Sequence, residues 1–119
     1  MNVLVEAAEA LYAALAAVDE VRLHRGIGAV INPPATALGP PEIEWTAYSA
    51  EPTGATFQVA LIVAKAPDAM DELFRLLPGV VEALHGVADA AVRSPAKPGT
   101  WPSGGVDLPA YLIDVDYAL

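Results

Sequence analysis

The sequence has no cysteine among its 119 residues, and it is poor in positive charge and in aromatic side chains. The lack of cysteine excludes disulfide bonds, thiolate nucleophiles and zinc sites with thiolate ligands. Six Lys and Arg residues stand against 15 Asp and Glu residues, which gives a formal net charge of −9. Tight binding to duplex DNA depends on cationic side chains that neutralise phosphates, so a nucleic-acid-binding surface is not expected here.

Long apolar runs are also missing. None of them approaches the roughly 20 residues that a membrane-spanning helix needs, and residues 1–6 lack the basic stretch that begins a secretory signal. We therefore expect a protein without a membrane partner that works in a cytoplasm or in a particle assembled there.

Proline and glycine, by contrast, are plentiful, with 11 and 9 residues, and they cluster in two stretches. Residues 33–41 are predicted to stay extended outside any central strand ladder, because proline lacks the backbone donor. Residues 94–107 are predicted to form a long loop around Trp101, and loops of this length are often functional. The remainder, which is rich in alanine and valine, fits one domain over residues 1–119 with one core.

Two helices are predicted from the spacing of apolar residues. In residues 2–18 these recur at steps of three and four, which places them on one helix face, and Asn2 is a suitable N-cap. A second helix is expected from the N-cap Asp68 to Gly86, with a kink or break at Pro78. Its predicted buried stripe consists of Met70, Leu73, Phe74, Leu77, Val81 and Leu84.

Alternating apolar and polar residues predict strands between and after the helices. The predicted strands are residues 21–24, 42–47, 56–63, 87–93 and 108–117, with a turn at 49–54. The segment 56–63 is apolar on both faces, so we expect it at the centre of the sheet. The predicted fold is α+β: a mixed, mainly antiparallel sheet of four to five strands with two α-helices packed on one face, in the order α-β-β-β-α-β-β.

The strand alternation also predicts an acidic face on the side of the sheet away from the helices. Its members are Glu42, Glu44, Asp114 and Asp116. Such carboxylates can serve general acid-base catalysis or bind a hard metal ion, but alternating acids are typical of a solvated sheet face. His24 and His85 have neither metal-ligand spacing nor a neighbouring nucleophile, so no catalytic residue, cofactor site or metal site is predicted.

Three aromatic residues are candidates for the core or for contacts with partners. Trp45, on an alternating strand, is expected in the core. Trp101, in a polar loop, is equally compatible with an anchor between subunits and with a residue folded back on its own domain. Tyr111 on the last strand is the second candidate interface residue.

The order of these segments resembles that of the tail terminators of long-tailed bacteriophages, the lambda-type family. The resemblance extends over nearly the whole chain and includes the alanine-rich first helix, Val21-Arg22-Leu23, Asn32-Pro33-Pro34 and the helix over 68–84. The strand start Asp107-Leu108-Pro109-Ala110-Tyr111 is similar to versions from phages of actinobacteria. The family has no invariant catalytic residues, so no site residue is implied by it.

The resemblance implies an α/β fold that forms a hexameric ring in the virion. Such a ring caps the tail-tube protein, ends tube polymerisation and offers its other face to head-completion or connector proteins, while DNA passes through the lumen. The acidic face would then line the lumen. Three alternatives stay open: another neck or tail-completion protein, a small dimeric α+β domain that binds a metabolite or peptide, and an enzyme that uses the acidic face with a divalent metal.

Overall fold

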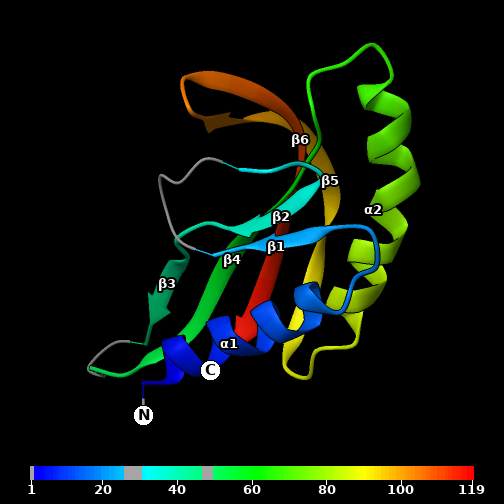
Figure 1. Ribbon diagram of the computed structural model, residues 1–119. Helices are drawn as coiled ribbons and strands as arrows, with labels where there is room; N and C mark the ends of the chain where they lie inside the picture. Colours follow the sequence, from blue (N-terminus) through cyan, green and yellow to red (C-terminus); the bar gives the residue numbers. More distant parts are fainter. Residues whose placement is uncertain (1, 26–30, 47–49) are drawn as a thin grey trace.

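The computed structural model describes residues 2–25, 31–46 and 50–119, which form six strands in one sheet and two helices that cover one of its faces (Figure 1). The elements are α1 (Val3–Ala16), β1 (Arg22–His24), β2 (Ala35–Leu38), β3 (Glu42–Trp45), β4 (Pro52–Ile62), α2 (Ala69–His85), β5 (Ala90–Ser103) and β6 (Val106–Ala118). The predicted α+β class is confirmed, with one strand more than expected.

The sheet is built around β4, the strand predicted to be central. The strand order is β1-β2-β4-β6-β5, and β3 also pairs with β4. Strands β1 and β2 are parallel, whereas the other described pairs are antiparallel. Along one side of β4, β2 pairs with its second half and β3 with its first half, and the corner Gly39-Pro40-Pro41 separates the two. At this corner the N–H of Gly39 donates to the carbonyl oxygen of Gln58 at 2.8 Å.

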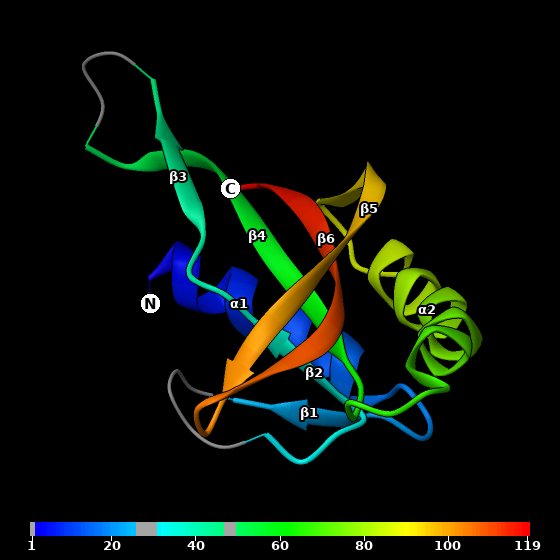
Figure 2. The same cartoon turned by 90° about the horizontal axis from the view of Figure 1, so that it is seen from above.

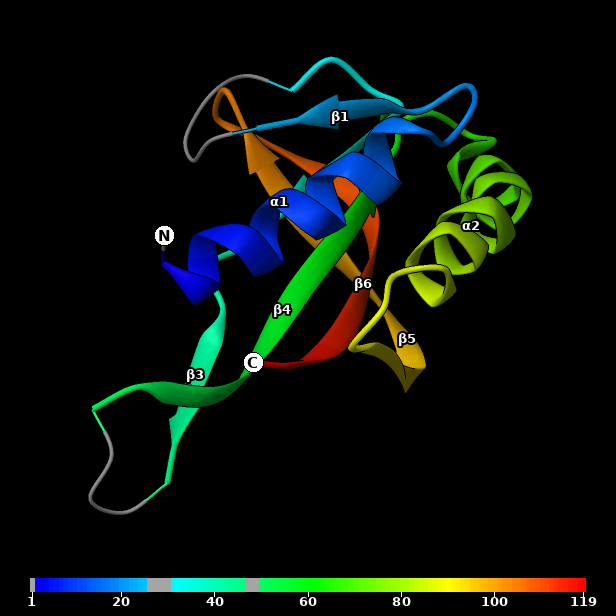
Figure 3. The same cartoon turned by 90° about the horizontal axis from the view of Figure 1, so that it is seen from below.

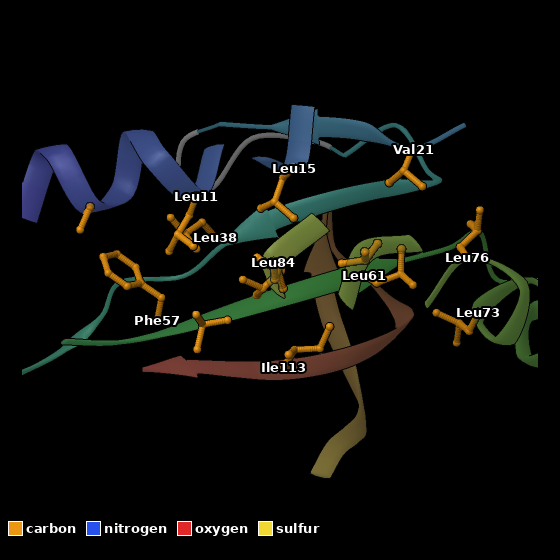
Figure 4. Packing of buried hydrophobic residues seen from close by; sticks show 14 of the residues in the cluster. Leu11, Leu15, Val21, Leu38, Phe57, Leu61, Leu73, Leu76, Leu84 and Ile113 are labelled. Atoms are coloured by element: carbon orange, nitrogen blue, oxygen red, sulfur yellow. The ribbon is translucent and has the colours of Figure 1, made fainter. Parts of the chain in front are cut away.

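The main core lies between the sheet and the helices (Figure 4). As predicted, α1 begins after Asn2, whose Oδ1 accepts a hydrogen bond from the N–H of Leu4 at 2.8 Å. Leu11 and Leu15 on α1 are fully buried. They pack in the same cluster as the alternate residues Phe57, Val59, Leu61 and Val63 of β4 and the residues after it. Each fully buried leucine contributes about 1.5–3 kcal/mol, so α1 is held mainly by its packing.

The second helix, α2, differs from its prediction in two ways. It runs unbroken through Pro78, and its buried residues are Leu73, Leu76, Val80 and Leu84. Burial on both sides of the proline offsets the one backbone bond that proline cannot make. In the described part of the chain, neither helix is long and apolar enough to cross a membrane.

The ends of α2 also differ in detail. Asp68 is the N-cap residue, but its side chain makes no capping hydrogen bond. Gly86 follows the helix with an ordinary φ of −78°, so its place does not depend on the left-handed conformation that favours glycine. His85 occupies the last turn, as expected.

The prediction of two long loops is wrong. Within 33–41, residues Ala35–Leu38 form the buried strand β2 between β1 and β4, because the prolines flank this segment and leave its backbone donors free. Within 94–107, β5 continues to Ser103, and Gly104-Gly105, both with positive φ, turn the chain into β6. The prolines of β5 are tolerated because β5 lies at the sheet edge and has a register shift between Arg93 and Lys97.

Other strand ends shift by a few residues. The predicted turn at 49–54 is partly strand, since β4 begins at Pro52. The predicted strand 42–47 ends at Trp45, and Ala47 lies outside the described residues. The predicted strand 87–93 begins at Ala90.

A second, smaller core lies on the sheet face away from the helices. It comprises Ile31, Ala35, Ala37, Ala60, Ile62 and Ala110, with Trp101, Leu108 and Leu112 packed against it. The N–H of Ile31 donates to the Oγ of Ser103 at 2.8 Å, which ties the end of β5 to the segment before β2. Both faces of β4 are therefore buried at this end of the sheet.

Candidate functional site

The four predicted acidic residues lie on one face of the sheet, opposite the helices. Glu42 of β3 is paired with Thr56 of β4, and Thr56 is paired with Asp116 of β6. Asp114 lies two residues before Asp116, and Glu44 two residues after Glu42, so all four carboxylates share a face. The predicted acidic face is thus present across β3, β4 and β6.

Arg93 of β5 places a positive charge within this face. Its Nη2 and Nε donate to the two carboxylate oxygens of Asp116 at 2.5 and 3.2 Å, and the Thr56 hydroxyl donates to the same carboxylate at 2.8 Å. These hydrogen bonds, from Arg93 first and then Thr56, lower the pKa of Asp116 below its ordinary value. The hydrogen bond and charge of Asp116, followed by the charges of Asp114 and Glu42, raise the pKa of Arg93.

The ion pair on this face borders a hollow of the surface. This hollow has a volume of about 370 Å³, and its lining includes Glu44, Thr56, Asp89, Arg93 and Asp116. The lowered pKa keeps Asp116 ionised at neutral pH, whereas a general acid needs a raised pKa. Among the described residues, His, Asp and Glu side chains form no group of three that is arranged to hold a metal ion.

The structure places Trp101 within its own domain. The side chain is half-buried and packs against the second core, next to residues of β6. This packing fits the folded-back interpretation, and a role of Trp101 as an anchor between subunits stays a prediction. The alternation of residues along β5 explains this placement, because Trp101 is paired with Leu108 of β6 and both side chains face the second core.

Trp45 was expected in the core, and that prediction is wrong. Its side chain is 54% exposed, and its indole N–H donates to the carbonyl oxygen of Ala50 at 3.2 Å. The cause is that β3 and the beginning of β4 extend away from the body of the domain (Figures 2 and 3), so that Trp45 lies outside the main core, whereas Ala55 of β4 still packs in it. We call this feature, residues Glu42–Trp45 paired with Pro52–Thr56, the β3–β4 arm.

A second exposed apolar area lies at the beginning of α2. Met70 and Phe74 are 64% and 53% exposed, although the predicted stripe buried them. The ring of Phe74 contacts that of Tyr111, with centroids 6.3 Å apart and an angle of 48° between the planes. Next to this pair is a groove of about 320 Å³, which we call the α2 groove; it is lined by Ala66, Pro67, Ala69, Met70, Leu73, Pro98, Gly99, Pro109, Ala110 and Tyr111.

Tyr111, the second candidate interface residue, is thus a half-buried wall of an apolar groove. The groove could not be predicted from the sequence, because Met70 and Phe74 follow the same helical period as the buried residues beside them. No protein-family model matches the chain, and no curated protein matches it in sequence. Its function is therefore inferred from its own surfaces.

Proposed function

We propose that this chain is a structural subunit that assembles with copies of itself into a ring. In the family that it resembles, the ring is hexameric, caps the tail tube of a long-tailed phage and joins the tail to the head, with DNA passing through. The proposal includes no chemical step and no cofactor. The observation that carries the assembly part is the β3–β4 arm (Figure 2), whose Trp45 is 54% exposed.

The arm supports assembly because β3 is an edge strand that pairs with β4 alone among the described residues, and a sheet edge leaves backbone groups that another chain can pair with. Its Trp45 is 54% exposed, and an exposed tryptophan is a frequent anchor of protein interfaces. The molecule is elongated, with principal extents of 51 × 29 × 24 Å, so surface is available at its ends for neighbouring copies.

The acidic face supports the passage of DNA through the ring. Glu42, Glu44 and Asp114 lie on it beside the ion pair of Arg93 and Asp116. With a chain charge of −9, a lumen lined by this face would repel phosphates and let DNA slide. This assignment requires the face to lie near the ring axis.

The proposal is tested by measuring the mass of the purified full chain by light scattering and by imaging its particles with negative-stain electron microscopy. Both measurements are made alone and with the tail-tube protein encoded in the same genome. Rings of six that cap and shorten growing tubes are expected. A chain that neither forms rings nor changes tube length contradicts the proposal, and binding only to head proteins would favour another neck protein.

The α2 groove favours one alternative, a small dimeric domain that binds a ligand. Its volume of about 320 Å³ is near the lower end of the range for small-molecule sites. A stable dimer in solution, together with saturable binding of an apolar metabolite or peptide at the groove, would support this alternative over the ring.

A further inference from the structure

We propose that the free edge of β3 in one copy pairs with the beginning of β5 in the next copy, residues 90–93, so that one antiparallel sheet continues from subunit to subunit. This inference rests on the proposed function and names the contact that builds the ring. The occupant of each of the two edges is a second copy of this chain.

Both edges are open in the isolated chain. Beside the arm the sheet has four strands in the order β3-β4-β6-β5, so that β3 and β5 form its two sides (Figure 2). Among the described residues, Glu42–Trp45 pair only with β4, and residues 90–93 pair only with β6. The backbone groups on the outer sides of these two segments lack a strand partner there, and such groups are a template for another strand.

The directions of the four strands allow identical copies to pair in this way. Each neighbouring pair among them is antiparallel, so β3 runs opposite to β5. Rotation about a ring axis keeps the direction of every strand relative to that axis. The β3 strand of the next copy therefore arrives antiparallel to β5 of the first copy, and the ladder continues in the slightly more stable antiparallel arrangement.

The other free edges are less suited to pairing. Beyond the register shift between Arg93 and Lys97, β5 contains Pro98 and Pro102, which cannot donate a hydrogen bond to a neighbouring strand. Strand β1 has only three residues. By contrast, β3 and residues 90–93 contain no proline. Proline and lysine thus protect the later part of β5, while its beginning stays open.

Pairing of two identical β3 edges is disfavoured by charge. Two β3 strands related by a two-fold axis would bring Glu42 and Glu44 opposite the same residues of the other copy, and like charges directly opposite each other destabilise a sheet. In the proposed contact, β3 lies beside Ala91 and Arg93 instead. Arg93 is already compensated by Asp116, so the preference follows from avoiding facing glutamates and not from a new ion pair.

The contact also keeps the two faces of the sheet apart around the ring. Rotation about the ring axis places Glu42 and Glu44 of every copy on the same side of the continuous sheet as Asp114, because these residues share a face within each copy. The helices of every copy then lie on the other side. An unbroken acidic surface of this kind is what the proposed lumen requires.

Cysteine cross-linking tests the contact directly, since the full chain has no cysteine of its own. Glu44→Cys and Ala91→Cys variants, both at exposed positions, are mixed and treated with a short bismaleimide. The matched control replaces Ala91→Cys by Lys97→Cys, which is exposed on the same strand beyond the register shift. A heterodimer yield above that of the control supports the pairing, and an equal yield overturns it. A Glu44→Cys homodimer in higher yield than the heterodimer indicates paired β3 strands and overturns it as well.

A second test blocks the edge of β5. Backbone groups of adjacent strand residues point to opposite sides, so one of Ala91→Pro and Val92→Pro removes an outward N–H and keeps the hydrogen bonds to β6. The variant that retains the circular dichroism spectrum of the wild type should self-associate at least about tenfold more weakly in sedimentation equilibrium. Val106→Ser, at a residue that is 47% exposed, is the control and should associate as the wild type does.

Wild-type association of the folded proline variant overturns the pairing. Where the wild type is monomeric, or where neither proline variant folds, the cross-linking yield alone decides.

The outcomes separate this contact from the proposed function. Rings of six that persist in the folded proline variant, together with a heterodimer yield equal to the control, keep the ring and remove the strand contact. Cross-linked chains that never close, and that leave tube length unchanged, retain the contact and remove the tail-capping function.

Discussion

Arg93 of β5 and Asp116 of β6 lie diagonally across the outer face of the sheet and share two hydrogen bonds, of 2.5 and 3.2 Å. Both side chains are about half exposed, 52% and 46%, so the pair contributes little to global stability. Its main effect is local. The guanidinium of Arg93 compensates the negative charge of the Asp116 carboxylate and holds this side chain in place.

Replacing Arg93 by Gln should raise the pKa of Asp116 toward its ordinary value. The pKa of Asp116 is lower in the folded state than in the unfolded state. Its contribution to the free energy of unfolding is therefore complete above the ordinary carboxyl pKa. This contribution is lost as the pH falls through the folded-state pKa. A carboxyl NMR titration of wild type and variant measures this shift. Arg75→Gln is the control, because Arg75 pairs with Glu20 and Glu72 and should leave Asp116 unchanged.

The two tryptophans should respond differently to replacement by alanine. Trp101→Ala removes packing from the second core and should lower the free energy of unfolding by roughly 1–3 kcal/mol, less than for a fully buried ring. Trp45→Ala removes an exposed ring and should change it by less than about 1 kcal/mol. Urea unfolding at low protein concentration measures both. Equal losses would contradict these placements.

Replacing Pro78 by Ala should stabilise the protein, because it restores a backbone donor inside α2. The expected gain in the free energy of unfolding is roughly 1–3 kcal/mol. Gly79→Ala is a matched change, since its new methyl group would meet Val18 at an ordinary 3.9 Å. It should gain about 0.5–1 kcal/mol. Thermal and urea unfolding compare them, and a destabilised Pro78→Ala would mean that the core requires a bend at the proline.

Truncating Leu11 to Ala should cost about 2–5 kcal/mol, because the side chain is fully buried between α1 and the sheet. Val5→Ala on the same helix, at a residue that is 50% exposed, should change stability by about 0.5 kcal/mol or less. A small effect of Leu11→Ala would show that α1 is not part of the cooperative core.

The sequence was sufficient where one periodicity dominated. The three- and four-residue steps predicted α1, and alternation predicted the faces of β6 and the shared face of Glu42 and Asp116. The prediction from sequence failed where proline was taken to exclude a strand. The prolines near β2 only flank the strand. The prolines of β5 lie within a strand at the sheet edge, where strand pairing tolerates them.

Periodicity also cannot decide which of two adjacent helical stripes is buried. On α2, Met70 and Phe74 fit a helical stripe as well as Leu76 and Val80 do, and the packing against the sheet selects the latter. Likewise, alternation in β3 identifies the faces of Trp45 and its neighbours but not how far the helices reach. The α2 groove and the arm were therefore visible only in three dimensions.

The corner Gly39-Pro40-Pro41 has a consequence for the size of any assembly. Two consecutive prolines restrict the backbone to a narrow range of φ, and the N–H of Gly39 fastens the corner to β4. The direction of the β3–β4 arm is thus restricted within the chain itself, before any contact with a neighbouring copy. In a ring of the kind proposed above, an arm of fixed direction would turn each added copy by the same angle relative to the last, and that angle determines how many copies complete a circle.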